Sequence, residues 1–265
     1  MRSAWASSVR RMPRLNLALA TLAAGIALAT PAFAYRPFDG TDGDVAGVGE
    51  FELEMGPAQF LSTPAGRYIV APATVLNLGV ARGLELVVDF KDFLGVEPVA
   101  GQPRMRLLDT DVFLKSVLRR GTLQGETGVS IALEAGPLLP EIGGNKNFGA
   151  QANLITSYRW DALSLHLNTS AALTRDQQLD GFVSLILEGP HDWAIRPVAE
   201  VYTEHETGGN DATYSALAGA IWQIRDAFAL DAAVRYAVQP GNNDFEVRFG
   251  LTWGVALWHH EETRK

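Results

Sequence analysis

The sequence predicts an all-β protein: an antiparallel transmembrane β-barrel of about twelve strands, preceded by a cleaved signal peptide. Two observations lead to this prediction, an export signal at the N-terminus and a series of segments in which apolar residues alternate with polar or small ones. Phe245 to Trp258 is the clearest segment, since every second residue from Phe245 to Leu257 is apolar. Side chains of a strand point alternately to its two faces. The run has about the length, roughly 9–11 residues, that a tilted strand needs to cross a bilayer, and it ends on an aromatic residue, as the closing strand of an outer-membrane barrel does.

Residues 1–34 have the three parts of a bacterial secretory signal. Arg2, Arg10, Arg11 and Arg14 form a basic region, Leu15 to Ala29 is apolar, and Ala32-Phe33-Ala34 is a small-x-small cleavage site. An uncleaved membrane anchor is the alternative, but the apolar run is short for a spanning helix. We therefore expect export and cleavage after Ala34.

Composition narrows the class of protein further. The net charge is −8, and it becomes −12 without residues 1–34, which hold four Arg and no acid. Without a basic patch for phosphates, nucleic acid is not an expected partner. The chain has no Cys, so no disulfide can stabilise it. No later stretch has about 18 consecutive apolar residues, so an exported membrane protein of this sequence has to be a closed barrel.

The elements follow in order. Residues 35–48 are rich in Asp and Gly and are predicted to form a lead-in on the periplasmic side. The barrel is predicted to span residues 49–258, and a charged tail covers 259–265. Pro72 suggests a break in the second strand. The predicted strands are 49–61, 67–79, 84–93, 104–119, 126–136, 148–158, 163–172, 179–188, 193–204, 213–223, 228–238 and 245–258.

An even number of strands places both chain ends on the same, periplasmic side. The connections after the second, fourth, sixth, eighth and tenth strands are predicted to be mostly short, and those after the third, fifth and ninth to be longer, as in transmembrane barrels. A soluble periplasmic β-sandwich or lipocalin-like barrel is the alternative. Against it stand the uniform strand length and the small residues on the polar face, which would fill a soluble core poorly. Aromatic residues near strand ends would form a girdle: Trp160, Trp193, Trp222, Phe228 and Tyr236.

Charged residues gather on the predicted lumen face. They would either form a cation-preferring pore, since rings of Asp and Glu select cations, or form salt bridges that plug a barrel that conducts nothing. Twelve strands lie between the filled interior of eight and the open channel of sixteen. The acidic residues are Glu52, Glu54, Glu85, Asp89, Asp109, Asp111, Glu134, Glu188, Glu200, Asp231 and Glu246, and the basic ones are Lys91, Lys115, Arg196, Arg235 and Arg248.

Three stretches resemble the outer-membrane β-barrel family named for a MetA pathway of phenol degradation. They are Arg36 to Asp42 running into Gly49 to Glu54, Pro72 to Gly79 followed by Leu84 to Leu86, and Leu108 to Lys115. The resemblance extends along the whole chain after the signal peptide. It implies an exported, transporter-like barrel for aromatic or other small compounds, and it brings no catalytic motif.

Two groups of residues have side chains of the types that catalysis or metal binding uses. Ser164, His166 and Asn168 share a strand face, and outer-membrane phospholipases use Ser, His and Asn on a twelve-stranded barrel. Neighbours at i and i+2 lie roughly 6.5–7 Å apart, however, beyond hydrogen-bond reach, so we expect a polar lining. His259 and His260 could bind a metal, but adjacent side chains of an extended chain point apart. We expect no catalytic residue, no metal site and no cofactor.

The function predicted from the sequence is that of a channel or transporter for passive passage of small solutes, with cations or small aromatic compounds as candidates. The expected location is the outer membrane of a Gram-negative bacterium. Expected partners are outer-membrane lipid, the barrel-insertion machinery and small-molecule solutes. A non-conducting structural or scaffold barrel is the main alternative, and an outer-membrane lipid hydrolase is a weaker one.

Overall fold

The computed structural model describes residues 36–96, 103–208 and 212–258, so the expected signal peptide and charged tail lie outside the described residues. Within the described ranges, no helix is long and apolar enough to cross a membrane. The described chain forms twelve strands and one short 3₁₀ helix, η1, over Thr122–Gln124. The strands are β1 (Glu50–Thr63), β2 (Gly66–Ala81), β3 (Leu84–Gly95), β4 (Met105–Arg119), β5 (Ser130–Leu138), β6 (Gly149–Arg159), β7 (Ser164–Leu173), β8 (Leu179–Glu188), β9 (Ile195–Glu206), β10 (Thr213–Arg225), β11 (Phe228–Gln239) and β12 (Asn242–Ala256).

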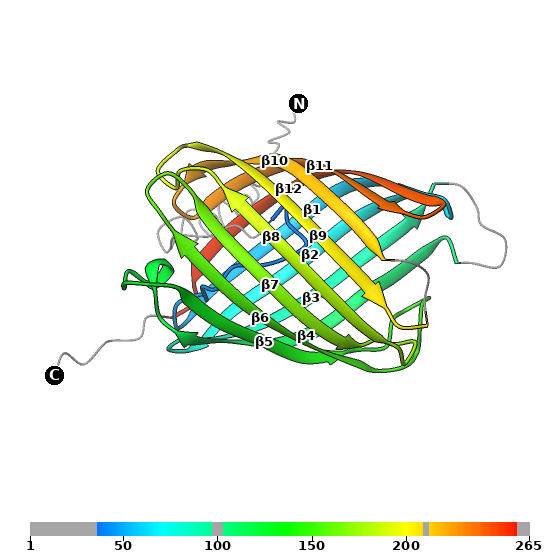
Figure 1. Cartoon of the computed structure of the whole chain (residues 1–265), viewed down its shortest axis with the longest axis horizontal. Helices are drawn as coiled ribbons and strands as arrows, with labels where there is room; N and C mark the ends of the chain where they lie inside the picture. Colours follow the sequence, from blue (N-terminus) through cyan, green and yellow to red (C-terminus); the bar gives the residue numbers. More distant parts are fainter. Residues whose placement is uncertain (1–35, 97–102, 209–211, 259–265) are drawn as a thin grey trace, which may run out of the picture.

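The strands close into a single antiparallel barrel, which confirms the predicted fold (Figure 1). Each strand pairs with its neighbours in the chain, and β1 also pairs with β12, with Phe51 opposite Val255. Closure removes both free edges of the sheet, so the ladder satisfies the backbone of every strand from within the barrel. The register shift between Val70 and Ala73 confirms the break expected at Pro72.

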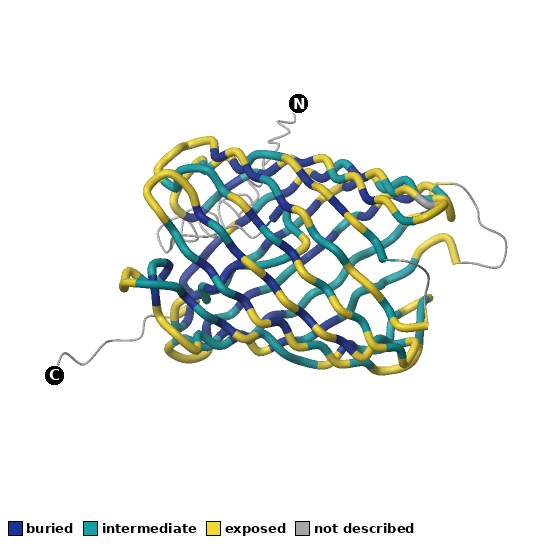
Figure 2. Tube along the Cα trace, viewed as in Figure 1, coloured by how far each residue is buried: buried dark blue, intermediate teal, exposed yellow. Residues whose placement is uncertain are grey.

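Buried and exposed residues alternate along the strands, as Figure 2 shows. In β12, Phe249 is 55% exposed and Trp253 38%, whereas Arg248 and Thr252 are buried. The apolar face predicted for this strand therefore points outward and the polar face points into the barrel. The same apolar exterior continues around the wall, for example at Leu114, Leu133, Leu154, Leu167, Val183, Val201 and Val234.

The connections differ between the two ends of the barrel. We call the end with residues 82–83, 160–163 and 226–227 the turn end, and the end with residues 139–148 and 174–178 the loop end. The connection after β4, at residues 120–129, is longer than predicted, because η1 and two glycines in the left-handed region, Gly125 and Gly128, keep the chain out of the sheet. The prediction that the fifth strand begins at residue 126 is therefore wrong, since β5 begins at Ser130.

Candidate functional site

Residues 36–48 lie inside the barrel, and we call them the lumen segment (Figure 1). Its backbone N–H groups donate to side chains of the wall. Those of Asp39 and Gly40 donate to the two carboxylate oxygens of Glu200 at 2.7 and 2.8 Å, and that of Thr41 donates to Oδ1 of Asn168 at 3.1 Å. A segment without ladder partners has to find acceptors elsewhere. The sequence predicted only a lead-in on the periplasmic side, and its position in the lumen was not foreseen.

Buried charges hold the start of the lumen segment. Nη1 of Arg248 donates to the carbonyl of Pro37, and Nη2 donates to Oδ1 of Asp39, both at 2.7 Å. The guanidinium of Arg36 lies 3.5 Å from Asp231 in a pair that is almost fully buried. Removing one partner of such a pair leaves an uncompensated charge. The wall therefore holds the segment at several points along its length.

Phe38 anchors the segment through apolar contact. It packs against a cluster of buried residues formed by Val198, Ile221 and Ala229 from β9, β10 and β11. All three side chains point into the barrel, and Val198 and Ile221 depart from the inward face of charged and small residues that the sequence predicted. Their contact with Phe38 explains the difference, because the lumen segment gives this part of the barrel a packed interior of its own.

Among the described residues, a large cavity and a smaller one lie along the barrel. The loop-end cavity has a volume of about 920 Å³ and is lined by residues 36 and 38–41 of the lumen segment together with the wall. Thirteen Asp or Glu side chains and six Lys or Arg side chains line it. The turn-end cavity has a volume of about 460 Å³ and is lined by residues 44–48 of the same segment. The lumen segment therefore lies between the two cavities.

The structure divides the residues singled out from the sequence into two groups. The first group lines the loop-end cavity: Glu54, Glu85, Asp89, Asp109, Asp111, Glu134, Glu246, Lys91, Lys115, Arg235 and Arg248. The second group does not line it: Glu52, Glu188, Glu200, Asp231 and Arg196. In this second group Glu200 and Asp231 bind the lumen segment, and Glu188 lies 3.7 Å from Arg196.

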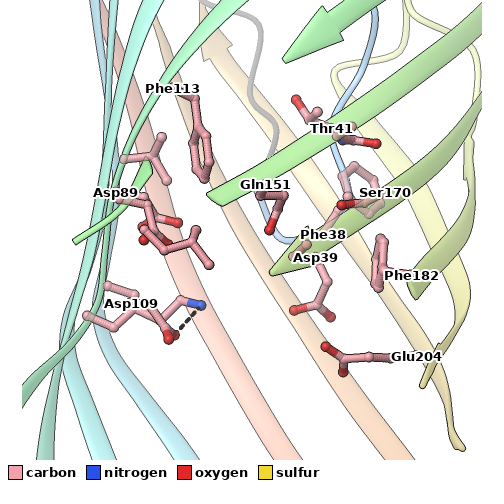
Figure 3. Close-up of a pocket in the computed structure, with 18 of the residues that line it drawn as sticks. Phe38, Asp39, Thr41, Asp89, Asp109, Phe113, Gln151, Ser170, Phe182 and Glu204 are labelled. Carbon is pink, nitrogen blue, oxygen red and sulfur yellow. Dashed lines mark hydrogen bonds and ion pairs between the residues drawn. The ribbon is translucent and has the colours of Figure 1, made fainter. Parts of the chain in front are cut away.

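Ion pairs neutralise part of the charge in the loop-end cavity. Nζ of Lys91 lies 3.1 Å from Oδ2 of Asp109, the interaction drawn as a dashed line in Figure 3. Arg175 lies 2.6 Å from Asp111. Asp89 is directly opposite Asp111 in the register of β3 and β4, but no cation of the described chain lies within ion-pair distance of it. The cavity therefore keeps an excess of negative charge.

Other cavity residues were not among those predicted. Some of them follow the predicted alternation: Asp180 and Phe182 have the same parity as Glu188 in β8, and Tyr202 and Glu204 have the same parity as Glu200 in β9. Extending the alternation along these strands could have found them. The residues contributed by the lumen segment and by the loops, such as Arg36, Phe38, Asp39, Glu141 and Arg175, had no periodic signal.

His166 forms a buried chain with residues of neighbouring strands. Its Nδ1 lies 2.9 Å from Oγ of Ser157, and its Nε2 lies 3.2 Å from Glu188. Oγ of Ser157 also accepts from the backbone N–H of Gly43 at 2.9 Å. Ser164 takes no part and lies instead 3.3 Å from Nε of Arg159. These contacts between Glu188, His166, Ser157 and Gly43 fix the lumen segment to β6, β7 and β8. They also bury the Ser157 hydroxyl beneath that segment.

Comparisons with solved structures find outer-membrane barrels. A COG4313 outer membrane channel from Pseudomonas putida F1 has a TM-score of 0.60 and 9% identity, with 82% of this chain and 99% of that chain covered. The NanC porin has a TM-score of 0.54 and 5% identity, covering 76% and 98%. The KdgM porin has a TM-score of 0.52 and 11% identity, covering 79% and 99%.

At these identities the likeness concerns the fold. No protein-family model matches the sequence, and no curated protein does either. The resemblance to the family named for phenol degradation therefore stays a prediction. The chain has the closed-barrel fold of outer-membrane porins and channels.

Proposed function

We propose that the protein is an outer-membrane channel for the passive passage of small solutes, with a preference for cations. One observation carries the proposal: the closed barrel holds a polar cavity of about 920 Å³ in which carboxylates outnumber basic groups by thirteen to six. Low-dielectric walls focus the field of such a lining, which raises the local concentration of cations and lowers that of anions.

The proposal places the barrel in the bacterial outer membrane. Leu, Val, Phe and Trp side chains cover the outward face of the strands, and lipid would be their natural surroundings. Export through the predicted signal peptide and insertion by the barrel-insertion machinery belong to the same proposal. A role in moving small aromatic compounds rests on the family resemblance and on the cavity residues Phe38, Phe93, Phe113, Phe182 and Tyr202.

A non-conducting scaffold barrel is the second candidate. The specific observation in its favour is the lumen segment, which lies between the two cavities and is bonded to the wall along its length. For the channel, the same segment is the constriction that a solute has to pass.

Planar-bilayer recordings decide between the two. The channel predicts discrete conductance with a reversal potential shifted toward the cation potential in a salt gradient, and a larger conductance after deletion of residues 36–47. Replacing Asp109 and Asp111 by Asn should reduce the cation preference while the barrel still folds, because Lys91 and Arg175 each lose a carboxylate partner, although Arg175 keeps Glu141 at 3.7 Å. Absence of conductance in the folded wild type would favour the scaffold, and conductance that appears only after the deletion would show that the lumen segment closes the barrel.

A further inference from the structure

The loop-end cavity has carboxylates without cationic partners on two of its walls. On one wall, Asp89 lies directly opposite Asp111 across β3 and β4. On the other, Asp180 lies directly opposite Glu206 across β8 and β9. Like charges directly across a strand pair destabilise a sheet. Arg175 compensates Asp111, but the other three carboxylates have no ion-pair partner among the described residues, and each would be stabilised by a cation in the cavity.

An aromatic surface adjoins the charges of the β8–β9 wall. The rings of Phe182 and Tyr202 lie 5.1 Å apart, centroid to centroid, and Phe182 is directly opposite Glu204 in the register. Nη1 of Arg235 donates to the Tyr202 hydroxyl at 2.7 Å, which holds that ring in place. Figure 3 shows Phe182 beside Glu204, with Asp39 of the lumen segment close by. This wall thus presents ring surface and unpaired carboxylate side by side.

The opposite wall repeats the combination, with a mixed aliphatic and aromatic cluster in place of the ring pair. Val87, Phe113 and Leu138 form a buried cluster with Val75 on the inner face of β2 to β5, and all four line the cavity. Asp89 lies on the same wall, as Figure 3 shows. An apolar inner surface of this kind does not stabilise a hydrated inorganic ion, because the ion keeps its water shell and water is not favourably placed against apolar groups. It fits a solute with an apolar body.

We infer that the loop-end cavity binds organic cations that carry an apolar body, such as aryl-alkyl ammonium ions. The ammonium group would lie beside Asp180 and Glu204, with the body against the Phe182–Tyr202 surface of the same wall. The opposite wall offers a second place with the same combination, Asp89 beside the cluster around Phe113. Cation–π attraction adds to the charge attraction at the aromatic rings. A volume of about 920 Å³ lies within the range of small-molecule sites, roughly 300–1,000 Å³. The inference names the solute class of the proposed channel and so rests on that proposal.

Calorimetric titration of the full-length protein in detergent tests the inference with four probes. Benzyltrimethylammonium has both the charge and the ring, tetramethylammonium has the charge alone, benzyl alcohol has the ring without charge, and benzoate has the ring with the opposite charge. Benzyltrimethylammonium should bind roughly tenfold more tightly than each of the other three, since each one lacks one of the two attractions. Equal binding of benzyl alcohol or benzoate would overturn the inference.

Substitutions of cavity residues test whether the binding takes place in this cavity. Glu204→Gln and Phe182→Ala should each weaken binding of benzyltrimethylammonium by roughly threefold to tenfold. Asp161→Asn, in a connection at the turn end, and Phe245→Ala, on the outward face of β12, are the matched controls and should leave it unchanged. Circular dichroism of each variant checks that it folds, and indifference of binding to both cavity changes would contradict the inference.

The binding test stands apart from conductance. If the barrel binds benzyltrimethylammonium in the cavity but shows no conductance, the channel proposal is contradicted and the inferred binding site is still supported. If the barrel conducts potassium but binds the four probes equally, the inferred binding site is contradicted and the channel proposal is still supported.

Discussion

Arg248 on β12 and Asp39 in the lumen segment are joined by a hydrogen bond of 2.7 Å between Nη2 and Oδ1. The guanidinium also donates to the carbonyl of Pro37 and to Glu246. Hydrogen bonds to charged groups contribute roughly 1.5–3 kcal/mol each. A single wall residue therefore stabilises the seated position of a segment that is 209 residues away in sequence.

The first prediction is that Arg248→Ala loosens the lumen segment. The backbone N–H groups of Gly40, Thr41 and Gly43, now bonded to wall side chains, should exchange with solvent about tenfold faster or more, since roughly 1.4 kcal/mol corresponds to a factor of ten. Hydrogen-exchange mass spectrometry of the barrel in detergent measures this. Arg225→Ala, at the exposed end of β10, is the control and should leave these amides protected.

The second prediction concerns the point where the lumen segment meets β2. A Cβ added to Gly79 would lie 1.9 Å from the carbonyl oxygen of Gly47 and 2.5 Å from that of Ala46. Gly79→Ala therefore has to displace backbone, which should lower the free energy of unfolding by about 1–3 kcal/mol. Gly181→Ala makes the same change where no atom lies within 4 Å, and it should alter stability by less than about 0.5 kcal/mol. Urea unfolding in lipid vesicles compares them, and equal losses would contradict the close approach.

The barrel itself could be predicted from the sequence because the residues of each strand alternate between those suited to the outer surface and those suited to the lumen. In β12 the alternation of Phe249 and Trp253 with Arg248 and Thr252 marks the outward and inward faces directly. Period-two alternation is a local property of the chain. The connection after β4 was harder to predict, since its departure from the sheet depends on backbone conformations at Gly125 and Gly128 rather than on a periodic pattern.

The lumen segment could not be predicted in the same way. Its place depends on acceptors brought together by barrel closure, such as Glu200 on β9 and Asn168 on β7, and no local pattern records these long-range contacts. Its composition, rich in Asp and Gly, looks like that of a solvated lead-in. The charged wall residues were identified from alternation. Whether a given carboxylate faces the cavity or binds the lumen segment depends on the path of that segment through the barrel, which alternation does not predict.

The third prediction is a pH dependence from His191, which lies in the connection between β8 and β9. Burial, together with the positive charges of Arg159 and Arg196, lowers the pKa of His191 to about 4 from its usual 6.5. The unfolded chain therefore binds a proton more readily than the folded one. The neutral imidazole's contribution to stability is complete above pH 6.5 and is lost as the pH falls toward 4.

Unfolding at pH 7.5 and pH 4.5 measures this contribution. His191→Asn should make the difference in stability between the two values smaller than in the wild type, because one titrating group is removed. His205→Asn, which removes an exposed histidine at the loop end of β9, is the control. A wild-type difference that His191→Asn leaves unchanged would contradict the assignment.

The last prediction tests which face of a strand meets lipid. Leu154 lies at the middle of β6 and points outward with 46% of its surface exposed, and Gln151 on the same strand lines the loop-end cavity. Leu154→Arg should cost about 2–4 kcal/mol of unfolding free energy in lipid vesicles, as expected for Arg at the bilayer midplane. Gln151→Arg should cost much less, because its guanidinium enters a polar cavity with an excess of carboxylates. Since the two variants add the same side chain to one strand, equal losses would show that the outward face of β6 does not lie against lipid.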